Sequence, residues 1–153
     1  MNSSQEMILE MMRARGRADA LDLRARSADM DGTALIAEED KVPAFDPQKD
    51  YSGWPRGAPV QDEGQVWTLL QPYNAAHYEG RPSGLRALWG LAHTKDPARA
   101  KPYVAPLGTS GVYMTGECCT DPDAEDPAAV YRSKVDNNAF SPSAYPANWD
   151  RVE

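Results

Sequence analysis

Two stretches of the sequence, VWTLLQPYNAA at residues 66–76 and VYRSKVDNNAF at residues 130–140, share the spacing that decides the expected fold. In both, valine and an aromatic residue are followed at the same offset by asparagine and alanine. Each stretch is preceded by an aromatic residue with glycine three positions later, in WPRGAPV at 54–60 and YMTGECC at 113–119. The same landmarks in the same order indicate a duplicated module.

Each copy then passes through a loop that contains proline and reaches a tryptophan, Trp89 in RALWGL or Trp149 in PANWDRV. The copies differ in their loops, around HYEGRPSG in the first and TDPDAEDPAA in the second, and connections tolerate insertions better than strands do. The short runs of Val, Tyr, Trp and Thr between Gly, Pro and Asn are typical of strands and tight turns. We therefore expect two small β modules, at residues 51–92 and 110–153.

The N-terminal part of the chain differs from the modules. Residues 1–30 contain no proline and no aromatic residue and are rich in helix-forming Met, Leu, Ala, Glu and Arg. Ser3 followed by Glu6 is a capping-box pattern that predicts a helix from Ser4, and a second short helix is expected from Thr33. The sequence thus predicts a helical arm at residues 1–41, with linkers at 42–50 and 93–109.

Apolar residues of the arm recur at alternating spacings of four and three, which is the heptad pattern of a coiled-coil seam. The seam comprises Met7, Met11, Ala14, Ala18, Leu21, Ala25 and Ala28. Seam alanines bury little area and Gly16 weakens a helix, so the arm needs something to pack on. The options are self-association through residues 4–28, docking on another protein, or the chain's own modules.

Composition makes nucleic acid and membrane partners improbable. The chain has 153 residues and a formal net charge of -7, and its pI near 4.8 opposes binding to phosphates or anionic lipid. Only 41% of residues are hydrophobic, and no apolar run approaches the length of a membrane span or a secretory signal. We expect an α+β protein, a helical arm followed by two small antiparallel β modules, that is not exported by the classical route.

The cysteines and histidines show no catalytic arrangement. Cys118 and Cys119 are adjacent, a disulfide between neighbours is strained, and no further ligands suggest a metal site, so free thiols packed in a strand are expected. His77 and His93 lie near no recognisable nucleophile pattern and are expected at the surface.

The acidic residues Asp121, Asp123, Glu125 and Asp126 lack the central glycine and closing glutamate of a calcium loop, so a solvated loop is expected. No catalytic residue, metal or cofactor is predicted. The chain is expected not to be an enzyme.

With these landmarks set out, each copy resembles the small chitin-binding carbohydrate-binding modules of families five and twelve. The resemblance covers about residues 51–152 and is closest in the second copy, at Tyr131, Asn138, Pro142, Pro146 and Trp149. Similar modules follow a helical segment in short tail-associated proteins of bacteriophages and prophages, and the chain resembles these better than a chitinase fragment. The resemblance implies a compact three-stranded antiparallel unit.

The resemblance also divides the aromatic residues into two groups. Positions where the family places core or closing aromatics are Trp54, Trp67, Trp89, Tyr113, Tyr131 and Trp149. Enzyme-borne members carry adjacent exposed tryptophans after the second aromatic strand, where this chain has Tyr73 to Tyr78 or Asn137 to Phe140. Residues expected to stack on a sugar or partner, or to hydrogen-bond it, are Tyr73, Asn74, Tyr78, Asn138, Phe140 and Tyr145.

The function that the resemblance implies is that of a phage virion or tail-associated structural protein, assembled in the host cytoplasm. Its arm would hold it to other virion proteins or to itself, and its tandem modules would contact a partner or a host glycan. One alternative is a stand-alone protein that binds chitin or cell-wall polysaccharide. The other is a purely architectural decoration protein of a capsid or baseplate.

Overall fold

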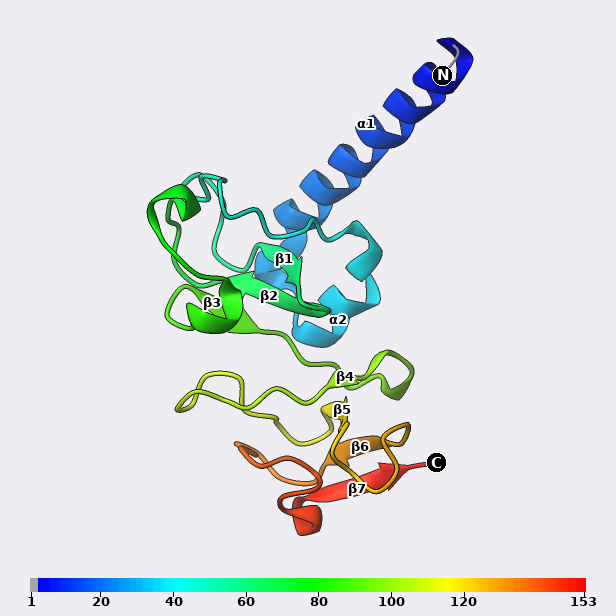
Figure 1. Cartoon of the computed structure of the whole chain (residues 1–153), viewed down its shortest axis with the longest axis vertical. Coiled ribbons are helices and arrows are strands. Elements are labelled where there is room, and N and C mark those ends of the chain that lie inside the picture. Colours follow the sequence, from blue (N-terminus) through cyan, green and yellow to red (C-terminus); the bar gives the residue numbers. More distant parts are fainter. Residues whose placement is uncertain (1–2) are drawn as a thin grey trace.

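A computed structural model describes residues 3–153 and has the expected α+β class, with an N-terminal helix and two small sheets (Figure 1). The first sheet has three antiparallel strands and the second has four strands of mixed direction. In Figure 1 the helix projects from one end of the molecule and the second sheet forms the other end.

Helix α1 spans Ser3–Arg26, one residue earlier than expected, and a 3-10 turn at Ser27–Asp29 continues it. Twenty-four helical residues correspond to about 36 Å of length. Leu23 is the only buried residue of α1 and packs with Leu35 and Val42. The arm is therefore attached to the body at its C-terminal end, and its N-terminal part projects into solvent.

Helix α2 spans Gly32–Ala37, and a 3-10 turn follows at Glu39–Lys41. Its start is fixed by Asp31, whose side chain accepts a hydrogen bond from the backbone N–H of Ala34 at 2.9 Å. Leu35 of α2 faces α1, whereas Ile36 packs with Val66 and Ala92 of the first module. This short helix therefore joins the arm to the sheet.

The first sheet contains β1 (Pro59–Asp62), β2 (Gln65–Leu69) and β3 (Trp89–Leu91) in that order. Glu63 and Gly64 connect β1 to β2 with φ angles of 53° and 77°, as a two-residue hairpin turn requires. Its core is strongly aromatic and contains Phe45, Tyr51, Trp67, Tyr73 and Trp89. Phe45 lies in the expected linker 42–50, but its N–H donates to Gln61 O at 2.8 Å, so this segment belongs to the module.

The second sheet contains β4 (Lys101–Pro102), β5 (Cys118–Thr120), β6 (Val130–Ser133) and β7 (Trp149–Val152). Strands β5, β6 and β7 form the expected antiparallel unit. Strand β4 pairs with β5 in parallel and comes from residues 93–109, which were expected to be a linker. The expectation of a purely antiparallel second module was therefore wrong at this edge.

The two sheets repeat the same register. In each sheet, the tryptophan that begins the last strand lies opposite the third residue after the repeat's valine. These pairs are Leu69↔Trp89 and Ser133↔Trp149. The first hairpins match residue for residue, with Pro59↔Thr68 and Val60↔Trp67 corresponding to Cys118↔Arg132 and Cys119↔Tyr131. The valine, the aromatic residue after it and the closing tryptophan of each copy therefore occupy equivalent positions in the two sheets.

The glycine of each copy has the same role. Gly57 and Gly116 have φ angles of 90° and 93°, a conformation that side chains rarely adopt. Their N–H groups donate to the carbonyls of Leu69 at 2.7 Å and Ser133 at 2.9 Å, respectively. The turn into the first strand is thus repeated together with the register.

The first aromatic residue of the repeat is not equivalent in the two copies. Tyr113 is buried and meets the Trp149 ring at 5.3 Å and 68°. In the first module the buried ring that meets Trp89, at 5.3 Å and 89°, belongs to Tyr51 rather than Trp54. Trp54 is half-buried at the surface of the core. The expectation that Trp54 is the counterpart of Tyr113 was therefore wrong, because the first copy has a longer connection between its aromatic residue and its glycine.

His93 joins the two modules and is buried, contrary to the expectation of a surface residue. Its ring stacks on Tyr113 with centroids 3.7 Å apart, and its Nε2 lies 2.8 Å from Gly111 O. A Cβ atom at Gly32 would come within 2.2 Å of His93 O, so the start of α2 packs tightly on this point. The other histidine, His77, is exposed as expected.

We predict that Leu23→Ala lowers the free energy of unfolding by about 3 kcal/mol, because it leaves a cavity between Leu35 and Val42. Chemical denaturation followed by tryptophan fluorescence measures this change. Leu107→Ala is the matched control, because Leu107 is exposed and its truncation should change stability by less than about 0.5 kcal/mol. Equal effects of both substitutions would contradict the proposed attachment of α1.

Burial lowers the pKa of His93 to about 4, from an ordinary value of 6.5, and the charge of Arg86 acts in the same direction. The imidazole of His93 therefore binds a proton more readily in the unfolded chain than in the folded chain. We predict that the protonation of His93 lowers the free energy of unfolding as the pH drops from 6.5 to about 4. The expected loss is about 3 kcal/mol. Unfolding measured across this range should show a shallower fall in His93→Gln, whereas His77→Gln should follow the parent.

Candidate functional site

Two of the residues predicted to contact a ligand are part of the core. Tyr73 is buried, and its hydroxyl accepts a hydrogen bond from Trp89 Nε1 at 2.8 Å. Asn138 is buried, donates through Nδ2 to Ser133 Oγ at 3.0 Å, and pairs with the backbone of Tyr113. Both residues follow a central strand and turn inward there, so they support the fold rather than a ligand, contrary to the expectation.

Two further predicted residues lie beside the first module's core. The Asn74 side chain accepts a hydrogen bond from Ala76 N at 3.1 Å and caps the 3-10 turn Ala75–His77. Tyr78 follows this turn, is 54% exposed, and meets Tyr73 edge to face at 5.3 Å. The first module therefore presents one exposed aromatic ring at this place.

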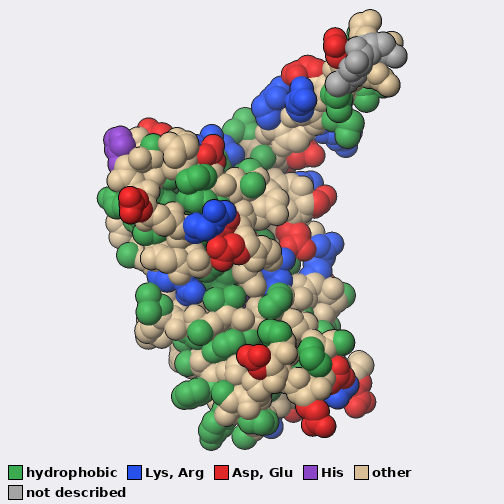
Figure 2. Space-filling model, viewed as in Figure 1, with side chains coloured by type: hydrophobic (Ala, Val, Ile, Leu, Met, Phe, Trp, Pro, Cys, Tyr) green, Lys and Arg blue, Asp and Glu red, His purple; other side chains and the backbone are tan. Residues whose placement is uncertain are grey.

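The remaining two predicted residues lie together on the second module. Phe140 is 57% exposed and Tyr145 is 49% exposed, and their ring centroids are 5.8 Å apart with planes inclined at 34°. We call this pair the aromatic platform. Figure 2 shows hydrophobic side chains gathered at this end of the molecule, over the second module.

The loop that carries the platform is held at several points. Trp149 Nε1 donates to Phe140 O at 3.0 Å, and Tyr145 N donates to Ser141 O at 2.9 Å. Asp121 accepts from Ser143 N at 2.9 Å. The backbone that carries the two rings is therefore held in place before any ligand binds.

Asp121 was expected in a solvated loop but is buried. Its carboxylate accepts hydrogen bonds from Asp123 N and Ser143 N, both at 2.9 Å, and so joins the acidic loop to the platform loop. Burial acts to raise its pKa, but these hydrogen bonds outweigh burial and the pKa is lowered. Asp123 and Glu125 are exposed as expected, and Asp126 pairs with Arg151 at 2.6 Å.

The platform has the properties of a stacking surface. Aromatic faces bind the apolar faces of sugar rings and of partner side chains, and hydroxyl groups beside them add hydrogen bonds. Ser141 and Ser143 lie in the same loop with their hydroxyl oxygens 3.2 Å apart. Neutral polar ligands with one apolar face suit this combination.

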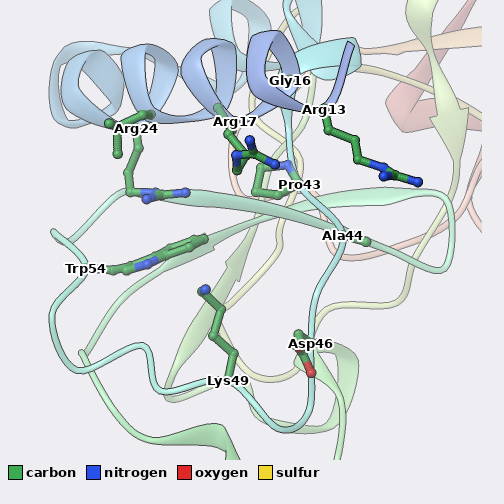
Figure 3. Close-up of a pocket in the computed structure, with 11 residues that line it drawn as sticks. Arg13, Gly16, Arg17, Arg24, Pro43, Ala44, Asp46, Lys49 and Trp54 are labelled. Carbon is green, nitrogen blue, oxygen red and sulfur yellow. The ribbon is translucent and has the colours of Figure 1, made fainter. Parts of the chain in front are cut away.

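The structure also contains a second surface, which was not predicted from the sequence. A cleft of about 730 Å³ separates α1 from residues 43–54, and Figure 3 shows its lining side chains converging from both sides. The Arg24 guanidinium lies 3.6 Å from the centroid of the Trp54 ring, and Lys49 Nζ lies 5.6 Å from it. We call this the basic cleft; its charged lining residues are Arg13, Arg17, Arg24, Lys49 and Asp46.

The basic cleft concentrates positive charge in a chain whose net charge is -7. Arg17 pairs with Glu10 at 3.0 Å, but Arg13 and Lys49 have no ion-pair partner among residues 3–153. Burial lowers the pKa of Arg24, whose Nε has no hydrogen-bond partner in the described part of the chain. An anionic group placed here would meet several cations and one donor that is already desolvated.

The sequence contained part of the signal for this cleft. Arg13, Arg17 and Arg24 are spaced by four and seven residues, which places them on one face of a helix. Lys49 lies in the segment expected to be a linker, and Trp54 was expected in the core of the first module. Their approach to α1 depends on tertiary packing.

The cysteines are free and buried, as predicted. Burial raises the pKa of both thiols, so they remain protonated at neutral pH. Among residues 3–153, no group of three or more His, Cys, Asp or Glu side chains is placed to hold a metal ion.

No protein-family model matches the chain, and no curated protein sequence matches it. Within the part of the chain that the structure describes, no helix combines the length and the apolar character that a membrane crossing requires.

Proposed function

We propose that this chain is a non-enzymatic attachment protein that binds a carbohydrate ring on the aromatic platform. The observation that carries this proposal is the exposed pair of Phe140 and Tyr145, whose ring centroids lie 5.8 Å apart on a hydrogen-bonded loop. Contiguous exposed apolar patches mark interaction sites, and aromatic residues are enriched in interfaces. Because the loop is already ordered, binding loses little conformational entropy.

The setting that we propose is a phage virion or tail, with a host-surface glycan or a partner virion protein as the target. The support is the resemblance of the repeats to carbohydrate-binding modules, together with an arm that projects from the body. The repeated register of the two sheets agrees with a tandem module. A stand-alone binder of chitin or cell-wall polysaccharide is the first alternative, and an architectural capsid or baseplate protein is the second.

Removal of either ring should weaken binding to insoluble chitin or cell-wall polysaccharide. We predict that Phe140→Ala and Tyr145→Ala each reduce affinity about tenfold, because each removes an apolar face worth about 1.4 kcal/mol of contact. Depletion from solution by the insoluble polymer measures this change. Phe140→Tyr keeps a ring and should bind like the parent.

Three outcomes separate the proposals for the platform. Retention of full binding in both alanine variants would remove the platform as the site. Binding that survives deletion of residues 1–20, which precede the attachment of α1 at Leu23, favours the stand-alone protein. If the parent binds no polysaccharide but is incorporated into particles regardless of added sugar, the architectural alternative is favoured.

A second candidate function is specifically favoured by the basic cleft, which suits an anionic group on the ligand or partner. Arg13 and Lys49 supply unpaired charge on its two walls. Dextran sulfate is a convenient probe of this chemistry, with neutral dextran as the control ligand.

We predict that Arg13→Gln and Lys49→Gln each lower affinity for dextran sulfate about fivefold, because each removes one contact worth about 1 kcal/mol. Arg15→Gln makes the same change in net charge, but Arg15 lines a different hollow with Ile8, Met11 and Met12. Isothermal titration calorimetry at two salt concentrations measures these affinities. Equal losses in Arg13→Gln and Arg15→Gln would show a dependence on net charge alone and reject the cleft.

A further inference from the structure

The predicted seam of α1 is uncovered along its length. Met7 and Met11 are 65% exposed and Leu21 is 62% exposed, and Ala14, Ala18 and Ala25 are exposed as well. Leu23, which attaches the helix to the body, follows Leu21 by two residues and therefore lies about 200° around the helix from it. The body thus holds the C-terminal end of α1 by the face that carries Leu23, and it also borders Leu21, which lines the basic cleft. From Met7 to Ala18 the seam residues are exposed.

The residues that flank the seam carry opposite charges. In the heptad pattern, Glu10 and Arg17 lie along one edge of the seam, and Arg15 and Asp22 lie along the other. In a parallel, in-register pair of helices, each residue of the first edge meets the residue five positions later on the second edge of its neighbour. Glu10 would meet Arg15 of the other copy, and Arg17 would meet Asp22 of the other copy.

A parallel pair therefore gains attraction on both edges, since symmetry repeats each of these contacts. In an antiparallel pair, like edges face one another, so Glu10 meets Arg17 of the other copy but Arg15 meets the apolar Ile8. The antiparallel arrangement thus has attractive pairs on one edge only.

Ion pairs within one chain leave the charged residues along both edges of the seam exposed. Glu10 and Arg17 pair within one chain at 3.0 Å while both side chains remain more than 60% exposed. Asp22 pairs with Arg26 at 3.0 Å and is 64% exposed. Arg15 has no ion-pair partner among residues 3–153. Exposed ion pairs are weak and share their charges readily with a further neighbour.

From this pattern we infer that the chain associates with a second copy of itself through a parallel, in-register coiled coil from Met7 to Leu21. The partner's seam covers the exposed methionines and leucine, and the alanine layers between them allow close approach. Because the bodies follow the C-terminal ends of the helices, both copies carry their modules at the same end of the assembly. The inference does not depend on any ligand at the aromatic platform or in the basic cleft.

Charge exchange across the seam tests the inference in the full-length chain. Analytical ultracentrifugation of the parent is expected to show concentration-dependent association. Arg15→Glu places a carboxylate opposite Glu10 of the other copy and should weaken association at least tenfold, whereas the double variant E10R/R15E should restore it. Circular dichroism checks that α1 remains helical in each variant.

A parent that is monomeric at about 100 μM, or a double variant that does not recover, overturns the inference. In an antiparallel pair Glu10→Arg opposes Arg17 of the other copy, so adding Arg15→Glu would not rescue it. These results leave polysaccharide binding to be measured separately, so the failure of self-association is distinguishable from a failure of the proposed function.

Disulfide trapping tests the orientation. Under mild oxidation Met7→Cys should cross-link to itself, and so should Ala18→Cys, because identical seam positions face each other in a parallel pair. The parent is the control, since Cys118 and Cys119 are buried and burial raises their pKa. Cross-linking that occurs chiefly between Met7→Cys and Ala18→Cys in a mixture would overturn the parallel arrangement.

Discussion

A buried tryptophan at the start of the last strand, met edge to face by a tyrosine at 5.3 Å, is the interaction on which each small sheet depends. Three short strands bury little area, so a single indole and its aromatic neighbours supply a large share of the core. The same indoles position the surface. Trp149 Nε1 donates to the carbonyl of Phe140, and Trp89 Nε1 donates to the hydroxyl of Tyr73, whose ring Tyr78 meets edge to face.

Helix α2 makes the two modules and the arm into one body. Thr33 Oγ1 accepts a hydrogen bond from Lys95 N at 2.9 Å, and Ile36 packs on Val66 and Ala92. In the 3-10 turn after α2, Glu39 pairs with Lys101 at 2.6 Å. Because Leu35 simultaneously packs on Leu23, the direction of α1 is set by the same short element. The basic cleft exists because α1 leaves the body at this point and passes over Trp54.

The repeat, the helix of the arm and the short helix after it were predictable because they depend on local spacing and capping chemistry. The orientation of individual side chains was less predictable. Tyr73 and Asn138 follow strands at positions that read as loops, yet each turns inward to hydrogen-bond a core residue. Likewise, Tyr51 takes the place expected for Trp54 because the connection to the glycine is longer in the first copy. An alignment of the two copies on their glycines does not reveal this difference in length.

The junction was the least predictable part, because its contacts join residues far apart in the chain. The parallel pairing of β4 with β5 and the burial of His93 have no signature in the local sequence. The Phe140 and Tyr145 pair could be selected in advance because proline and serine around both rings indicate a surface loop. The basic cleft could not be predicted, since Lys49 and Asp46 come from a segment with no periodicity and meet the three arginines of α1 only in the folded chain.

The outer strands of the second sheet bear on how this protein behaves when many chains are crowded together. Strand β4 ends at Pro102, which has no N–H to offer to an approaching strand, and β7 presents the exposed charges of Asp150 and Arg151. Both devices discourage the addition of strands from neighbouring molecules. Chains gathered at high local density can therefore keep their modules separate, without fusing sheet to sheet into an aggregate.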